Sequence, residues 1–265
     1  MFKCLVQICH PMDKLARRIL VVNAKGGCGK TTIATNLAAI FSRKQSTMLL
    51  DYDPQGSSMR WLKQRVDDHP KVIGMRGGEG AYQPNVTRTW LMQNPDYERT
   101  VIDAPAGVAG HDLARLVHQA DTILIPVQPS PIDIAASADF IRDLLLEGKV
   151  RSLNIRLGVV ANRVKANTRV YQSLRRFLST LHLPFVGVLR DTQNYMKAAE
   201  QGLGVHELTP SQVRQDVQQW QPILHWLDRK PYVEAVTNRE RISAREVPAA
   251  TASGGHTGAT GSHYS

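Results

Sequence analysis

The 265-residue chain has little cysteine, few aromatic residues and no long apolar run. Its three cysteines are too few and too unevenly placed for a disulfide framework or a cysteine-rich metal site. No apolar run approaches the roughly 18 residues that a membrane-spanning helix needs. The short apolar stretch near the amino end has no small-residue cleavage site of the kind that secretory signals carry. We therefore expect a protein of the reducing cytoplasm, with no segment in a membrane.

The composition that remains is typical of a folded globular protein. Hydrophobic residues make up 42% of the chain and charged residues 21%, which disfavours collagen, a coiled coil or disorder throughout. Residues 249–265 differ, because 14 of these 17 residues are Ala, Gly, Ser or Thr and bury too little surface to offset the entropy lost on ordering. We expect an N-terminal extension over residues 1–17, one domain over 18–230 and a disordered tail over 231–265.

The net charge of +10 is spread unevenly along the chain. Residues 1–150 contain 18 basic and 15 acidic residues, whereas residues 151–265 contain 15 and 8. No acid occurs from residue 151 to residue 190, and the eight basic residues of this interval are Arg151, Arg156, Arg163, Lys165, Arg169, Arg175, Arg176 and Arg190. Such a basic interval is either a surface for a polyanion or a solvated helix face. The charge pattern leaves both interpretations open.

Apolar runs typical of strands alternate with amphipathic segments of helix length. The expected strands cover residues 19–22, 47–50, 100–102, 123–127, 157–160 and 186–189. The first expected helix begins near residue 33, and the others cover residues 57–64, 113–119, 132–146 and 170–181. This alternation predicts an α/β fold, with a mostly parallel twisted sheet and helices on both faces.

Two further segments of the expected fold are a long loop and a C-terminal helix. Residues 71–85 contain several glycines with no clear period, which indicates a long loop over the sheet edges. Residues 213–227 place Val213, Trp220 and Leu227 on one helical face, which predicts a closing helix in spite of Pro222.

A glycine-rich segment stands between the first expected strand and the first expected helix, and it reads Lys25-Gly26-Gly27-Cys28-Gly29-Lys30-Thr31-Thr32. Glycines let successive backbone N–H groups turn onto phosphate oxygens, and the helix that follows favours an anion at its N-terminus. Lys30 would neutralise phosphate charge, and the Thr31 hydroxyl would be available to Mg²⁺. The segment therefore predicts a nucleotide site with Mg²⁺ at the phosphates, in a P-loop NTPase-like fold.

The second lysine of this loop, Lys25, calls for a separate explanation. One lysine is enough for the phosphates bound in the loop, so a lysine at the rim is free to reach out of its own site. We expect Cys28 to be a small filler rather than a catalytic thiol.

The loop resembles that of the ParA/MinD family of deviant-Walker ATPases, which reads KGGxGKT[T]. The resemblance continues in the segments Asp51-Tyr52-Asp53-Pro54-Gln55-Gly56 and Val101-Ile102-Asp103-Ala104-Pro105, which are similar to the family's second acidic motif and its Walker B motif. Together these motifs cover about residues 18 to 230 in the expected order. One departure is Pro105-Ala106-Gly107, where the family often has two prolines or Pro-Gly.

The resemblance implies a dimer in which two subunits sandwich two ATP molecules. Lys25 would then cross to the ATP of the partner subunit, and Asp53 would position the attacking water. Asp51 and Asp103 would hold Mg²⁺ through waters, and Thr31 would bind the metal directly. Asn162 matches the position that hydrogen-bonds the adenine, although asparagine also commonly ends strands as a turn residue.

Several branches of the family can be set aside on the residues that they require. Nitrogenase-type iron proteins need cysteines after the Walker B motif, and none follows Cys28. MinD proteins end in a basic amphipathic membrane helix, whereas this chain ends in Ala, Gly, Ser and Thr. An ATP-dependent metabolic enzyme similar to dethiobiotin synthetase needs neither a lysine at position 25 nor the Asp-Pro-Gln segment, and it stays a minor alternative.

The remaining members are positioning ATPases whose ATP-bound dimers bind nucleoid DNA without sequence preference. About 18 residues precede the first expected strand, so we expect no helix-turn-helix for operator recognition. Nonspecific DNA binding rests on phosphate neutralisation, which gives the basic interval a function. The DNA-binding candidates are Arg175 and Arg176 on the polar side of the helix over 170–181, and Arg190 just after the last strand.

Three segments are similar to a narrower group, the McdA-type ATPases that space carboxysomes along the nucleoid: residues 51–61, 125–133 and 189–195. In that group an adaptor stimulates ATP hydrolysis and releases the ATPase from DNA. A chromosome or plasmid partition ParA has the same cycle with a different adaptor. The adaptor is therefore expected to be McdB-like or, in the alternative, ParB-like.

Overall fold

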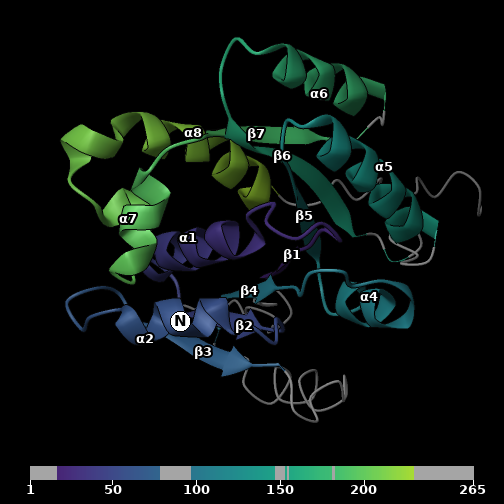
Figure 1. Cartoon of the computed structure of the whole chain (residues 1–265). Coiled ribbons are helices and arrows are strands. Elements are labelled where there is room, and N and C mark those ends of the chain that lie inside the picture. The colour runs from purple at the N-terminus through teal and green to yellow at the C-terminus, as the bar shows by residue number, and fades with distance from the viewer. Residues whose placement is uncertain (1–16, 78–96, 147–152, 154, 181–182, 230–265) are drawn as a thin grey trace, which may run out of the picture. The chain divides into compact units, whose positions relative to one another are not determined.

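The computed structural model describes residues 17–77, 97–146, 153, 155–180 and 183–229 (Figure 1). The first strand begins at Arg17, so the rest of the expected N-terminal extension lies outside the described residues. The expected tail over 231–265 lies outside them too. No described helix is both long enough and apolar enough to span a membrane.

Seven strands form one sheet in the order β3-β2-β4-β1-β5-β6-β7, and every neighbouring pair is parallel. The strands are β1 (Arg17–Val21), β2 (Thr47–Asp51), β3 (Val72–Arg76), β4 (Arg99–Asp103), β5 (Thr122–Val127), β6 (Arg156–Val164) and β7 (Phe185–Arg190). This all-parallel sheet confirms the predicted α/β fold.

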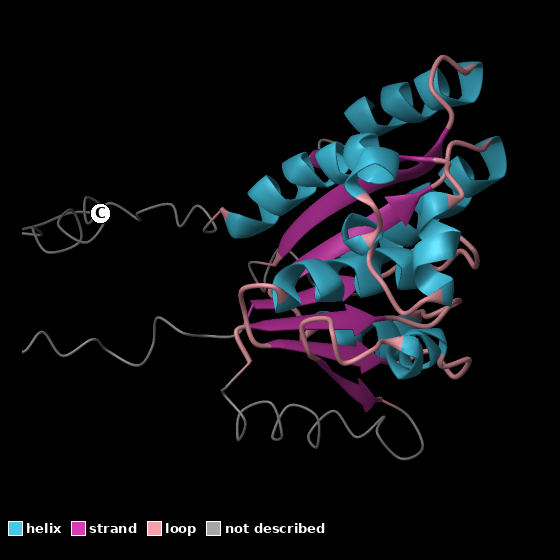
Figure 2. Cartoon of the chain, turned by 90° about the vertical axis from the view of Figure 1, so that its left-hand side faces the viewer, coloured by secondary structure: helices cyan, strands magenta, loops and turns pink. Residues whose placement is uncertain are grey.

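Helices cover both faces of the sheet, as Figure 2 shows. One apolar cluster joins the sheet to α4 (Gly110–Val117), α5 (Pro131–Leu146) and α6 (Arg169–Thr180). The cluster on the other face joins it to α1 (Lys30–Ser42), α2 (Ser57–Gln64), α7 (Asn194–Glu200), the 3₁₀-helix η2 (Val205–Glu207) and α8 (Pro210–Asp228).

The central strands are buried on both faces, which explains their nearly continuous apolar sequence. Every residue of β2 and β5 is buried. Leu50 belongs to the cluster under α4, α5 and α6, whereas its neighbour Leu49 belongs to the cluster under α1 and α8. The strand register places Asp51 beside Asp103 and Val21 beside Asp103. Both acids therefore lie at the carboxyl edge of the sheet, next to the loop that follows β1.

The long loop expected over residues 71–85 is wrong in its first part, because β3 forms there as an edge strand. Its exposure alternates, and its central residue is Gly74. A Cβ atom at Gly74 would lie 2.2 Å from Cδ2 of Leu62, so a larger residue there would require the Leu62 side chain on α2 to shift. Residues 78–85 lie outside the described residues.

Two elements, α7 and η2, were not predicted, and β6 extends beyond its expected end to Val164. The closing helix is confirmed as α8, which contains Pro222 and buries Val213, Trp220 and Leu227 as expected. Leu181, at the end of the expected helix over 170–181, lies outside the described residues.

Candidate nucleotide-binding site

The glycine-rich loop leads from β1 to the N-terminus of α1, as predicted. Gly27 and Gly29 have φ angles of 77° and 96°, which lie in the region that glycine adopts without strain. A Cβ atom at Gly29 would also lie 2.0 Å from Nδ2 of Asn162. Gly26 and Gly27 are exposed. The loop therefore presents backbone to solvent at a helix N-terminus, where N–H groups and the helix dipole attract anions.

Lys30 is the first residue of α1 and is only 6% exposed. Its Nζ atom donates a hydrogen bond to the carbonyl oxygen of Lys25 at 3.2 Å. The ammonium group is thus held at the loop, where a phosphate would lie. Cys28 is buried, and burial raises the pKa of its thiol, in keeping with a filler rather than a reactive group.

Two side chains that the sequence analysis missed brace this loop. Asn23 donates from Nδ2 to the Pro126 carbonyl at 2.8 Å, and its Oδ1 accepts the backbone N–H of Lys25 at 3.1 Å. Gln128 donates from Nε2 to the Gly27 carbonyl at 2.7 Å. Each follows a strand closely, Asn23 after β1 and Gln128 directly after β5. That placement at the carboxyl edge was the available signal for both.

Asp103 lies beside α1 at the end of β4 and is fully buried. Its Oδ2 atom accepts hydrogen bonds from the hydroxyls of Thr31, at 2.8 Å, and Ser58. Its Oδ1 atom is buried with no hydrogen-bond partner among the described residues. Burial raises the pKa of Asp103 to about 7, and the two hydroxyl donors offset that effect only in part. A divalent cation near Oδ1 would favour the ionised carboxylate, so this donor set fits Mg²⁺.

Asp51 and Asp53 flank the end of β2. The Asp51 carboxylate accepts the backbone N–H groups of Asp53 at 3.0 Å and Met59 at 3.1 Å. Burial raises the pKa of Asp51, and these hydrogen bonds lower it. Asp53 is half-buried, and its Oδ1 atom accepts the backbone N–H of Gln55 at 2.9 Å. The structure thus gathers Asp51, Asp53 and Asp103 at one edge of the sheet.

Lys25 lies at the rim of the loop. Its side chain is 42% exposed, and its Nζ atom is 3.9 Å from Oδ1 of Asp133 on α5. The Ser130 hydroxyl donates to the other carboxylate oxygen of Asp133 at 2.7 Å. The Lys25 side chain is therefore oriented toward α5.

Asn162 is placed differently from the sequence-based expectation. It lies inside β6, which continues to Val164, rather than at the end of a strand. Its side chain is buried and donates from Nδ2 to the Cys28 carbonyl at 2.8 Å. This hydrogen bond fixes the loop backbone at Cys28. The adenine contact expected of Asn162 stays a prediction.

The basic interval divides into outward and inward cations. Arg175 and Arg176 are exposed on α6, and neither forms an ion pair with a described residue. Arg190 is the last residue of β7, not the residue after it, and its guanidinium bonds both oxygens of the buried Asp216. Arg156 is partly buried and donates to the Arg229 carbonyl at 2.7 Å. Arg163, Lys165 and Arg169 are exposed as well, so the open basic surface covers α6 and the segment from Arg163 that leads into it, while Arg151 lies outside the described residues.

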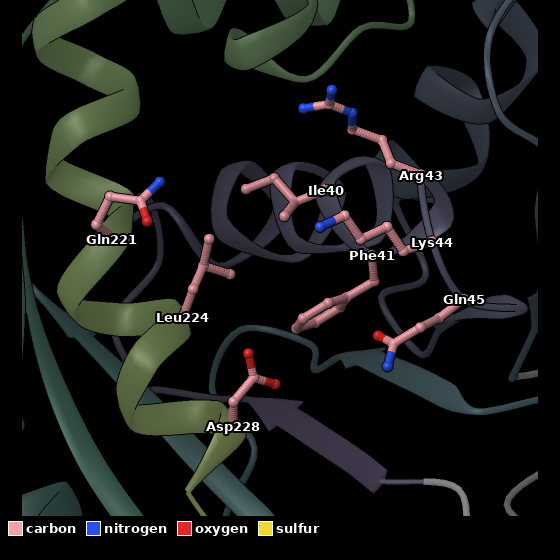
Figure 3. Close-up of a pocket in the computed structure, with 8 residues that line it drawn as sticks. All are labelled: Ile40, Phe41, Arg43, Lys44, Gln45, Gln221, Leu224 and Asp228. Carbon is pink, nitrogen blue, oxygen red and sulfur yellow. The ribbon is translucent and has the colours of Figure 1, made fainter.

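A separate hollow lies at the other end of α1 (Figure 3). It measures about 410 Å³ and is lined by Ile40, Phe41, Arg43, Lys44, Gln45, Gln221, Leu224 and Asp228. Phe41 and Leu224 point into it from α1 and α8. The loop precedes the first residue of α1, whereas Ile40 and Phe41 belong to the last turn, so this hollow is not part of the phosphate site.

Comparison with known proteins agrees with this geometry. The family described as "CobQ/CobB/MinD/ParA nucleotide binding domain" matches residues 19–205. The maintenance of carboxysome distribution protein A of Halothiobacillus neapolitanus is 26% identical over 191 residues, which cover 72% of this chain and 87% of that protein. The protein of the same name from Gloeobacter kilaueensis is 26% identical over 220 residues, which cover 83% and 97%.

A solved structure shares the fold. Apo McdA from Cyanothece aligns with a TM-score of 0.63 at 17% identity, over 79% of this chain and 99% of that chain. Because the family match spans both β1 with its loop and the carboxylates of β2 and β4, this chain belongs to the CobQ/CobB/MinD/ParA nucleotide-binding family.

Proposed function

We propose that this protein is an ATPase that positions carboxysomes on the nucleoid. In this proposal it dimerises on ATP, binds DNA without sequence preference, and leaves the DNA when an adaptor stimulates hydrolysis. The observation that carries the proposal is that Lys30 and Thr31 of the glycine-rich loop lie at the same edge of the sheet as the two acids Asp51 and Asp103. The similarity to two carboxysome distribution proteins supports the choice of cargo.

The residues that would hold ATP and Mg²⁺ lie together at the loop. The N–H groups of residues 25–32 and the Lys30 ammonium would bind the phosphates, and the Thr31 hydroxyl would bind the metal. Asp51 and Asp103 would accept hydrogen bonds from water on the metal. Mg²⁺ supplies charge neutralisation at the phosphates when bound, and Asp53 would orient the attacking water.

The homodimer and the DNA surface rest on two groups of cations. Lys25 is exposed at the rim, from which it would reach a phosphate of the partner subunit's ATP. Arg175 and Arg176 would neutralise DNA phosphates from α6. Such a protein would be cytoplasmic and associated with the nucleoid.

Two alternatives use the same site. A chromosome or plasmid partition ParA would share the cycle and respond to a ParB-like rather than an McdB-like adaptor. An ATP-dependent enzyme of the dethiobiotin-synthetase type would need no DNA and no dimer formed by ATP. Stimulation of ATPase activity by a purified adaptor, in the presence of DNA, separates these possibilities.

The proposal is tested first by separating nucleotide binding from hydrolysis. Lys30→Ala removes the buried cation and is expected to abolish ATP binding in a fluorescent-ATP titration. Asp53→Ala is expected to keep ATP binding and to lower turnover by about 100-fold or more, as for other groups that orient or activate a nucleophile. Lys44→Ala, an exposed lysine just beyond α1, is the matched control. Turnover that Asp53→Ala leaves unchanged would remove Asp53 from the mechanism.

A further inference from the structure

The first turn of α2 contacts both acidic strand ends. The backbone N–H of Met59 donates to Oδ2 of Asp51 at 3.1 Å, and the Ser58 hydroxyl donates to Oδ2 of Asp103. Ser58 is fully buried although it lies only two residues after the loop that carries Gly56. A buried hydroxyl whose hydrogen bond goes to a buried carboxylate is a specific arrangement, because the ionised acceptor strengthens the bond.

Two hydroxyls share one oxygen of Asp103. Thr31 approaches Oδ2 from α1 and Ser58 approaches it from α2, while Oδ1 has no donor among the described residues. Rotation of the carboxylate about its Cβ–Cγ bond would therefore break both bonds at once. The two donors select one orientation, in which Oδ1 is the oxygen left to accept from a water on the metal.

The two hydroxyls differ in their tasks. Thr31 is also the group proposed as a direct metal ligand, so its position is set by the metal as well as by Asp103. Ser58 donates to Asp103, and its position is set by α2 rather than by the metal. It is thus the donor that holds the carboxylate independently of the metal.

The far end of α2 is fixed, so Ser58 does not depend on its own turn alone. Trp61 donates from Nε1 to the Leu203 carbonyl at 3.0 Å. Arg65, directly after α2, forms a two-point ion pair with Glu207 at 2.8 and 2.7 Å, and both side chains are buried. These contacts tie α2 to η2 and limit how far its first turn can move.

We propose that Ser58 is a positioning residue for the metal site, which orients Asp103 so that Oδ1 faces the cation. This inference rests on the proposed ATP and Mg²⁺ site. It assigns no new ligand, since Ser58 acts through Asp103.

The test measures metal binding rather than turnover. The full chain with ADP is titrated with Mn²⁺ as a paramagnetic substitute for Mg²⁺, and free Mn²⁺ is followed by electron paramagnetic resonance. Loss of one hydrogen bond to a charged group predicts about tenfold weaker Mn²⁺ binding in Ser58→Ala. Ser57→Ala is the matched control, because the neighbouring Ser57 hydroxyl accepts from Arg60 and does not contact Asp103. Ser58→Thr keeps a hydroxyl and is expected to recover most of the loss.

The outcomes are distinct. If the Ser58 hydroxyl were only a buried group with a hydrogen-bond partner, Ser58→Ala would change the melting temperature of the nucleotide-free protein and leave the Mn²⁺ titration unchanged. Equal Mn²⁺ affinity in Ser58→Ala and wild type would therefore overturn the inference and leave the proposed function standing. Absence of ADP-dependent Mn²⁺ binding in the wild type would overturn the proposed site, and this inference with it.

Discussion

The lysines at positions 25 and 30 share one loop, yet their surroundings differ, which indicates different roles. Lys30 is buried and bonds the loop backbone at 3.2 Å. Lys25 is held 3.9 Å from Asp133 with 42% of its side chain exposed. The Asp133 side chain is only 12% exposed, but the 3.9 Å contact is too long for a hydrogen bond, and Asp133 also accepts from the Ser130 hydroxyl. Lys25 can therefore leave Asp133 without breaking a hydrogen bond and reach a phosphate outside its own subunit.

This difference predicts how Lys25→Ala behaves. The variant keeps the groups that bind its own nucleotide, so ATP affinity is expected to stay within about threefold of wild type, as for other exposed substitutions. Dimerisation on ATP is expected to disappear, because the charge that bridges the subunits is gone. Light scattering with and without ATP measures this, with Lys71→Ala as an exposed lysine control. A Lys25→Ala protein that still dimerises on ATP contradicts the sandwich arrangement.

At this scale the predictable residues are those whose partners are close in sequence. The loop from Lys25 to Thr32 and the acids after two strands are visible as local motifs. Asn23 reaches Pro126 across 103 residues, Gln128 reaches Gly27 across 101, and Ser58 reaches Asp103 across 45. Such contacts depend on which strands become neighbours, so the sequence shows that Asn23 and Gln128 follow strands but not which atoms they bond.

Among the elements, the central strands, the long helices and the edge strand β7 could be predicted, whereas β3, α7 and η2 could not. The strands β2 and β5 are buried on both faces and read as apolar runs. The edge strand β3 alternates in exposure around Gly74, whose lack of a side chain serves the packing of Leu62. The seven-residue α7 is too short to show a helical period. A short or one-sided element carries too little apolar pattern to be distinguished from a loop.

The 3₁₀-helix η2 makes the stability of the protein depend on pH. Burial lowers the pKa of His206 to about 4, with Glu207 opposing the shift and Arg43, Arg65 and His69 reinforcing it. Both ring nitrogens lack hydrogen-bond partners among the described residues. From pH 6.5 down to about pH 4 the unfolded chain binds a proton that the folded protein does not. The free energy of unfolding therefore falls as the pH falls through this window.

Replacing this histidine tests the effect. Between pH 7 and pH 5 the wild type is expected to lose about 2 kcal/mol of unfolding free energy through His206, and His206→Leu is expected to lack that part of the loss. Urea unfolding at pH 8, 7, 6 and 5 measures it. The comparison at pH 8 isolates the packing change, because the wild-type histidine is neutral there in both states. Parallel pH profiles for the two proteins would contradict the assignment.

At the scale of the whole molecule, the sequence shows the excess of positive charge but not which of the basic side chains face solvent. Arg156 and Arg190 belong to the same basic interval as Arg175 and Arg176, and the fold turns the first two toward α8. Removing Arg190 would leave the buried Asp216 without its cation, which costs about 3–5 kcal/mol in comparable pairs. A variant that includes Arg190 would thus mix a loss of DNA affinity with a loss of stability.

The DNA proposal is best tested with Arg175→Ala/Arg176→Ala, because both side chains are exposed and without ion pairs to described residues. With ATP, nonspecific DNA affinity is expected to fall, and the slope of log K against log salt to become shallower by about 0.9 for each DNA phosphate that the variant no longer neutralises. Arg43→Ala/Lys44→Ala removes the same charge from the far end of α1 and is expected to keep the wild-type slope. Dimerisation on ATP should survive in both, since neither pair belongs to the glycine-rich loop. Equal slopes for the two variants would mean that α6 is only a solvated face, and the search would move to Lys197 and Arg214, which are exposed on α7 and α8.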